Sequence, residues 1–183
     1  MHATLKPPTL KSPALKPPTL KPPTLKPPTL KPEDVFRAEL ALTTDHLKMW
    51  ANSLHDCATV ELRNAPGFWS LEVAPLAQGA CPFELMLRAD QRYDLAIAGE
   101  YYEDRPITDI SIFAGLAKSV ASGHVSRVSI RSALTGALQS LETRISLSDG
   151  TYWFGARSVM PAAHACPPEF EIKEFKRYLP FRR

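Results

Sequence analysis

The sequence has few of the features that identify secreted, membrane-spanning or disulfide-bonded proteins. Its 183 residues include only three cysteines, Cys57, Cys81 and Cys166, which are odd in number and widely spaced. Such a set does not form a disulfide framework and fits a reducing compartment. No stretch approaches the roughly 18 consecutive apolar residues of a membrane span, and the first residues lack the apolar segment of a signal peptide. We therefore expect a cytoplasmic protein that does not bind membranes.

Motifs that would fix a chemistry are also missing. The sequence has no glycine-rich phosphate loop, no Ser-His-Asp signature and no strand that interleaves basic and aromatic residues. The pairs His55-x-Cys57 and His164-x-Cys166 do not have the spacing of a zinc ribbon or finger. Cys81 precedes a proline at the start of a predicted strand, which is not an environment that activates a nucleophilic thiol. We expect no metal, no cofactor and no catalytic residue.

The positive charge of the chain is concentrated at its start. Residues 1–32 hold six of the 22 basic residues and no acidic one, which leaves 16 basic and 19 acidic residues in the remainder. A nucleic-acid-binding domain carries its basic surface on the folded part. Specific nucleic-acid binding is therefore not expected.

The same segment repeats TLKPP every five residues from Thr4 onward, and it contains ten prolines between Pro7 and Pro32. Proline removes backbone donors and favours extended polyproline II, so we predict a disordered tail over residues 1–32. No two of its prolines are three apart, which excludes the P-x-x-P ligands of aromatic grooves. The interpretations left open are a stiff spacer, a dispensable extension and a weak attraction to polyanions.

Periodicity in the remainder predicts an α+β domain. Pro32, Glu33 and Asp34 precede an apolar stripe that is typical of a helix, over about 33–54 and with a break allowed near Thr43. A second helical stripe starts at Ile110 and ends at Gly123. Alternating segments around these helices predict strands, listed here by range: 59–63, 68–73, 83–88, 93–97, two more between 125 and 148, and a short edge strand at 152–154.

The resulting order, α-ββββ-α-ββ, describes an antiparallel sheet of about six strands with helices packed on one face. We predict a single domain over residues 33–160 and a C-terminal extension over 161–183. In that extension Ile172, Phe175 and Leu179 are spaced as one helical stripe, which indicates an amphipathic docking helix or a frayed tail.

One segment between a predicted strand and a predicted helix gathers acidic and aromatic side chains. Loops on a rigid scaffold often carry functional sites, so these residues are candidate ligand or partner contacts. The structural alternative is that the aspartate caps the helix, the tyrosines cover the sheet edge and the remaining acids are solvated. The candidates are Glu100, Tyr101, Tyr102, Glu103, Asp104 and Arg105.

Three arginines of the later strands are further candidates. Arg127 and Arg131 alternate with Val128 and Ile130, which we expect to face the core, and Arg144 lies on the neighbouring strand. Cross-strand ion pairs on a solvated face explain such a pattern. An uncovered basic face that receives an acidic partner is the functional interpretation.

The element order resembles that of small α+β partner-binding proteins, including secretion chaperones, in which an exposed sheet face holds another chain. This resemblance implies a chaperone- or adaptor-like interaction module that binds a protein partner or a second copy of itself. The alternative is an enzyme or small-ligand binder that uses residues 100–105, which requires a concave pocket where their carboxylates converge.

Overall fold

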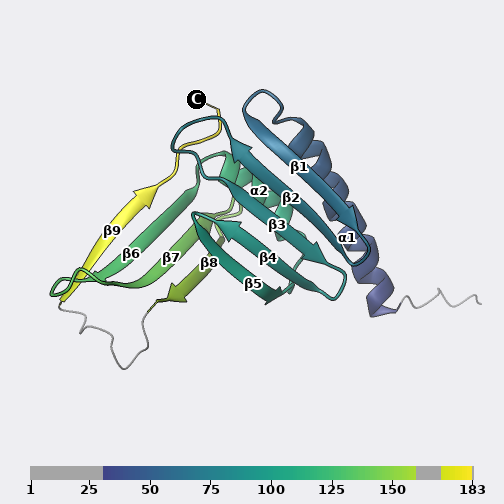
Figure 1. The fold of residues 1–183 in the computed structure, drawn as a ribbon. Coiled ribbons are helices and arrows are strands. Elements are labelled where there is room, and N and C mark those ends of the chain that lie inside the picture. Colours follow the sequence, from purple (N-terminus) through teal and green to yellow (C-terminus); the bar gives the residue numbers. More distant parts are fainter. Residues whose placement is uncertain (1–30, 160–169, 183) are drawn as a thin grey trace, which may run out of the picture. The chain divides into compact units, whose positions relative to one another are not determined.

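A computed structural model of the chain describes residues 31–159 and 170–182. The predictions for the TLKPP repeat up to residue 30, and those for His164 and Cys166, lie outside these ranges. The class predicted from sequence, α+β, is confirmed. The single sheet of about six strands is wrong, because the described residues form two antiparallel sheets of five and four strands (Figure 1).

The elements follow one another along the chain in the order helix, five strands, helix, four strands. The first sheet has the order β1-β2-β3-β4-β5 and the second β8-β7-β6-β9. Their bounds are α1 Pro32–Asn52, β1 Ala58–Ala65, β2 Phe68–Pro75, β3 Phe83–Arg88, β4 Arg92–Ile97, β5 Glu100–Pro106, α2 Ile112–Ala121, β6 Val125–Ser132, β7 Leu138–Ser146, β8 Tyr152–Ser158 and β9 Glu171–Arg177.

Helix α1 agrees with the sequence prediction to within two residues and is not broken. Proline stands at its start, and Glu33 and Asp34 occupy its first turn, where the helix dipole favours negative charge. Thr43 and Thr44 are buried, and the Thr44 hydroxyl donates to the Ala41 carbonyl at 2.9 Å. This bond to the helix's own backbone satisfies the hydroxyl, so the threonines do not end the helix.

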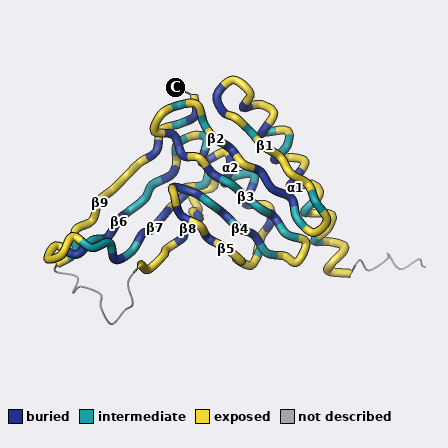
Figure 2. Tube along the Cα trace, in the orientation of Figure 1, coloured by how far each residue is buried: buried dark blue, intermediate teal, exposed yellow. Residues whose placement is uncertain are grey.

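Both helices pack on the same face of the first sheet. The Trp50 ring of α1 lies 6.1 Å from Phe83, and the Phe113 ring of α2 meets Tyr93 edge-on at 4.9 Å. Phe83 and Leu87 are four residues apart in β3 and therefore lie on the same face of the sheet. Tyr93 lies on that face too, because it pairs with Leu87. Figure 2 shows buried residues along β2, β3 and β4, the central strands of this sheet.

The second sheet shares this core through one face, which we call its inner face. Val125, Ile145 and Trp153 occupy it and are all buried. The indole N–H of Trp153 donates to the Tyr93 hydroxyl at 3.0 Å, and the Trp153 ring meets Tyr102 edge-on at 5.0 Å. The two sheets are thus joined by aromatic side chains from β4, β5 and β8.

The prediction that Val128 and Ile130 face the core shared by the two sheets, and that Arg127 faces away from it, is wrong, although Ile130 is buried on the opposite face at 9% exposure. Val125 pairs with Ile145 on the inner face, and strand side chains alternate with a period of two. Arg127 therefore shares the inner face with Val125, while Val128 and Ile130 share the opposite one. A shift of one residue exchanges the two faces of a strand, and the apolar pair at 128 and 130 favoured the wrong register.

Two segments have a different structure from the one predicted. Residues 100–105 are not a loop but most of strand β5, which pairs with β4 through a register shift near Tyr93. The predicted C-terminal helix is strand β9, which pairs with β6 from Ser126–Arg177 to Ser132–Glu171. The spacing of Ile172 and Phe175 fits one turn of a helix, but the unpaired edge of β6 supplies a complete hydrogen-bonding partner for an extended chain.

Candidate functional site

The acidic and aromatic candidates of β5 do not converge, because a strand sends successive side chains to opposite faces. Glu100 and Tyr102 are buried, whereas Tyr101 is 66% exposed and Glu103 is also exposed. The hollow that Glu100 and Tyr101 line has a volume of about 200 Å³, below the roughly 300–1,000 Å³ of drug-sized ligand sites. Tyr101 and Glu103 line a second hollow, of about 170 Å³, together with Glu84 and Asp94.

Glu100 and Tyr102 hold the two sheets together. A carboxylate oxygen of Glu100 lies 3.3 Å from Nη1 of Arg157 in β8. The Tyr102 hydroxyl donates to the Gly155 carbonyl at 3.3 Å, and burial raises the pKa of that phenol above its ordinary value. Both contacts reach from β5 to β8 and so join the first sheet to the second.

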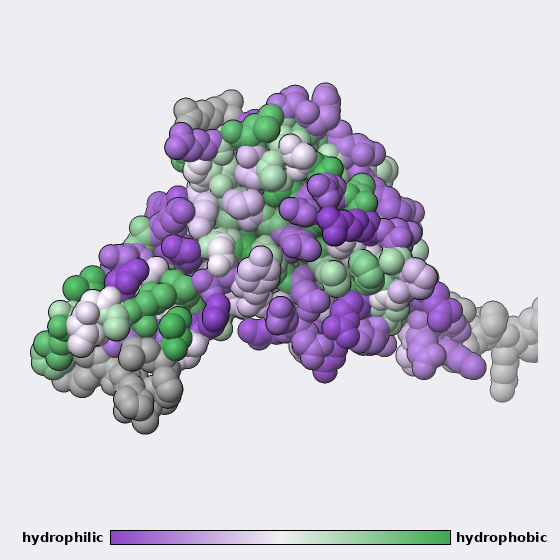
Figure 3. All heavy atoms as spheres, in the orientation of Figure 1, coloured by the Kyte–Doolittle hydropathy of each residue, from purple (hydrophilic) through white to green (hydrophobic). Residues whose placement is uncertain are grey.

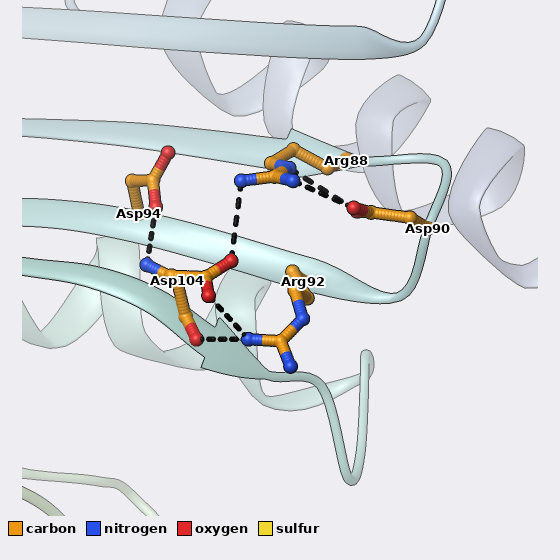
Figure 4. A network of polar contacts seen from close by, with 5 residues as sticks. All are labelled: Arg88, Asp90, Arg92, Asp94 and Asp104. Atoms are coloured by element: carbon orange, nitrogen blue, oxygen red, sulfur yellow. Dashed lines mark hydrogen bonds and ion pairs between the residues drawn. The ribbon is translucent and has the colours of Figure 1, made fainter.

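Asp104 belongs to a surface network at the register shift of β5 (Figure 4). Its backbone has φ of 56°, and its N–H donates to the Asp94 carboxylate at 2.6 Å. Its own carboxylate receives Arg92 at 2.6 Å and Arg88 at 3.3 Å. These groups are exposed, so their ion pairs contribute little to stability. They fix the geometry of the bulged edge.

A second arm of this network joins the end of β3 to the turn that follows it. Arg88 donates to both carboxylate oxygens of Asp90, at 3.1 and 2.6 Å. This hydrogen bonding lowers the pKa of Asp90 below its ordinary value. Arg105, the last candidate of this strand, lies with its guanidinium carbon 5.9 Å from the centre of the Tyr102 ring.

The three candidate arginines of the second sheet lie in three different environments. Arg127 extends from the inner face and donates to the Ala98 carbonyl at 2.8 Å. Arg131 contacts the Glu174 carboxylate of β9 at 3.3 Å. Arg144 lies over the exposed Tyr152 ring at 4.1 Å, which is a cation–π geometry. Only Arg144 is next to an exposed aromatic surface.

No family model, curated protein or solved structure matches this chain. Neither helix in the described ranges is long and apolar enough to cross a membrane. Within the same ranges, no three histidine, cysteine, aspartate or glutamate side chains form a group able to hold a metal ion.

The surface that the sequence did not reveal is the outer face of the second sheet, opposite its inner face. Cross-strand pairing places Phe154, Arg144, Ser126 and Arg177 in one row across β8, β7, β6 and β9. Tyr152 and Phe175 lie on the same face, and the exposed fractions of Tyr152, Phe154 and Phe175 are 55%, 51% and 75%. Figure 3 shows hydrophobic surface at the lower-left end of β6 and β9, and hydrophilic surface over the lower part of β4 and β5.

A larger hollow, of about 570 Å³, lies between the ends of the two helices and the C-terminal segment. Trp50, Cys57, Lys118 and Arg182 line it, together with backbone and apolar neighbours. Arg182 is already bound to the Asp56 carboxylate at 2.5 Å. None of the residues predicted from the sequence lies there.

Cys81 is a buried thiol with a strongly perturbed pKa. Burial raises its pKa to about 11 from the ordinary 9.0, and nearby Arg127 and Lys176 only partly oppose this shift. The folded protein thus favours the neutral thiol, whereas the unfolded chain ionises near pH 9. This contribution to stability is complete below pH 9 and is lost as the pH rises towards 11.

The expected result is slow native labelling of Cys81. At pH 8 a two-unit shift reduces the thiolate fraction roughly a hundredfold, and burial slows access further. Iodoacetamide labelling, followed peptide by peptide with mass spectrometry in native buffer and in urea, measures this difference. Equal rates in the two conditions would contradict the buried placement of Cys81.

Proposed function

We propose that the chain is a non-enzymatic protein-interaction module, chaperone- or adaptor-like, whose partner binds the outer face of the second sheet. The observation that carries this proposal is the presence of Tyr152, Phe154 and Phe175 on that one face, all more than half exposed. These aromatics lie on the two edge strands with Arg144, Glu142 and Ser126 between them, and a mixture of exposed aromatic and polar groups is typical of interaction surfaces. Aromatic residues and arginine are also the side chains that most often dominate binding energy.

The chemistry of the face indicates what the partner carries. Arg144 and Arg177 stand in the same row as Phe154. Arg177 has no hydrogen bond or ion pair with any described residue. We therefore expect a protein segment that presents apolar side chains with carboxylates beside them.

The alternative, a small-ligand binder or enzyme built on residues 100–105, has less support. Glu100 is bound to Arg157, Tyr102 to Gly155, and Asp104 to two arginines, so these groups are engaged in holding the fold. Their carboxylates lie on different faces of β5 instead of around one cavity.

Replacing both Tyr152 and Phe154 with serine is expected to reduce partner binding at least tenfold, because removal of anchoring aromatics has effects of that size. Affinity capture from the native lysate with the full-length chain, quantified protein by protein, measures the loss. The matched control is Met49→Ser on α1, whose side chain is 64% exposed and distant in the fold from β8. If both variants capture the same proteins as the unchanged chain, the outer face is not the binding surface.

Charge reversal at position 144 gives an independent measurement. Arg144→Glu is expected to weaken capture of the same proteins. The difference in capture between the unchanged chain and this variant is expected to become smaller at high salt, because salt screens the charge of Arg144. A partner that binds Arg144→Glu equally well would contradict the acidic chemistry proposed for it.

A further inference from the structure

Strand β9 is an edge strand with almost every side chain exposed. It pairs with β6 on one side and stands last in the order β8-β7-β6-β9. Figure 1 shows no described element beside its other edge. All its residues from Ile172 to Arg177 are exposed, and Phe175 is exposed to 75%. An open edge of this kind offers unpaired backbone groups to another strand.

Two hydrogen bonds determine which backbone groups are unpaired. The Tyr178 N–H donates to the Val125 carbonyl, and the Ala133 N–H donates to the Phe170 carbonyl, at 3.1 and 2.6 Å. Both pairs lie in the register of β6 and β9. In an antiparallel ladder, residues that bond to the neighbour alternate with residues that point away from it. The residues whose N–H and C=O point to the open edge are therefore Glu171, Lys173, Phe175 and Arg177.

The charges on these four residues are complementary to the charges on the same strand of a second copy of the chain. When the strand is laid antiparallel against its own copy with Glu174 at the centre, Glu171 stands opposite Arg177 of the second copy, and the same pair forms again by symmetry. Lys173 stands opposite Phe175 of the second copy. Glu174 meets its own copy, but Arg131 already lies 3.3 Å from each Glu174 carboxylate. Cross-strand pairs of opposite charge stabilise such a register.

Both members of the new pair are free to form it. Arg177 has no hydrogen bond or ion pair with a described residue. Glu171 is held only loosely, by Lys173 at 4.0 Å. By comparison, β1 is an edge whose charged residues Glu61 and Arg63 are already paired at 3.0 Å. The β8 edge contains no acidic residue.

We propose that β9 pairs antiparallel with β9 of a second copy of this chain, around a twofold axis at Glu174. The pairing forms about eight backbone hydrogen bonds and joins two β8-β7-β6-β9 sheets into one. The odd-numbered side chains of β9 lie on the outer face, so the two Phe175 rings become diagonal neighbours there. The inference goes beyond the proposed function, because it concerns the edge of the sheet and doubles the outer face available to a partner.

Sedimentation velocity of the purified full-length chain tests the pairing. A dimer that dissociates on dilution in the micromolar range is the expected result, since an edge-to-edge contact is small. In Arg177→Glu, a glutamate at position 177 stands opposite Glu171 of the second copy at both symmetry-related sites. The dissociation constant of the dimer is therefore expected to rise roughly tenfold. Arg37→Glu is the matched control: it is the same substitution at a side chain of α1 that is 79% exposed, so it is expected to leave the dimer intact.

Exchange of the two charges makes the test specific for this register. Glu171→Arg alone is expected to weaken the dimer like Arg177→Glu, whereas a mixture of these two single variants is expected to form a heterodimer. The double variant with both changes regains dimerisation. A chain that stays monomeric at every concentration, or a dimer indifferent to Arg177→Glu, overturns the proposal. The loss of partner capture in the Tyr152 and Phe154 variants is a separate readout, so either idea can fail alone.

A second variant tests the backbone contribution. Proline has no backbone N–H, and the N–H of Lys173 points to the open edge of β9. Lys173→Pro therefore removes a bond to the second copy and keeps every backbone hydrogen bond between β6 and β9. Loss of the dimer with an unchanged circular dichroism spectrum supports the pairing, and an unchanged dimer contradicts it.

Discussion

Gly155→Val is expected to lower the free energy of unfolding by about 3 kcal/mol, at the upper end of the usual range for overpacking. A side chain at position 155 would meet the Tyr102 and Trp153 rings, with a Cβ only 2.6 Å from the Trp153 ring. These rings are packed edge-on against each other and cannot withdraw without opening the contact between the two sheets. The Gly155 carbonyl also accepts the Tyr102 hydroxyl, so displacement of β8 loses that bond.

Thermal unfolding of the purified protein measures this effect. For a chain of this size, about 3 kcal/mol corresponds to a decrease in melting temperature of roughly 6–12 °C. Gly115→Ala is the control. Position 115 lies within α2 and has nothing within 4 Å of a new Cβ, so alanine is expected to stabilise the helix by up to about 1 kcal/mol. If both substitutions destabilise equally, the close packing around Gly155 is not the cause.

The elements with clear periodicity were predictable from the sequence. Phe113 and Val120 of α2 are buried as expected, and so is Ile110, which lies just before the helix. The first two hairpins have the predicted strands, with Pro66 and Gly67 turning the first. The dipeptide Asp149-Gly150, a strong hairpin signal in any sequence, lies at the return from β7 to β8. In each case the pattern and the local turn residues agree, which is when such predictions succeed.

The division into two sheets was not predictable in this way, because it depends on which distant strands meet. Glu100, Tyr102 and Arg127 are polar or amphipathic residues that a pattern assigns to the surface. In the structure they lie between the sheets, where each finds a partner: Arg157, Gly155 and Ala98 respectively. Most buried polar groups have such partners, although Nε of Arg127 is buried with none among the described residues, and a linear sequence does not show where the partners lie.

Only part of the outer face of the second sheet was predictable from the sequence. The run Tyr152-Trp153-Phe154 was correctly interpreted as a strand. A period of two already implies that when Trp153 is buried its neighbours are exposed. That step was available from the sequence. Phe175 was different, because β9 is extended only through its pairing with β6, and its own residues fit a short helix equally well.

Phe113→Ala is expected to have the largest effect of any substitution considered, a loss of about 3–5 kcal/mol in the free energy of unfolding. Phe113 is fully buried in α2, and its ring meets Tyr93 edge-on at 4.9 Å. Tyr93 in turn accepts the Trp153 indole N–H. A cavity at this position removes support from α2, from the first sheet and, through Tyr93, from the contact with the second sheet.

Denaturant unfolding of the full-length protein gives the free energy, and Phe154→Ala is the matched control. The Phe154 side chain is 51% exposed on the outer face, so its removal is expected to change stability by less than about 0.5 kcal/mol. The same control establishes that a loss of partner binding at position 154 does not arise from unfolding. A double-mutant cycle with Tyr93→Leu measures the ring contact itself, which edge-on geometry places at about 0.5–1.5 kcal/mol. A coupling near zero would mean that Phe113 stabilises the fold only by filling space, and that α2 supports the second sheet by another route.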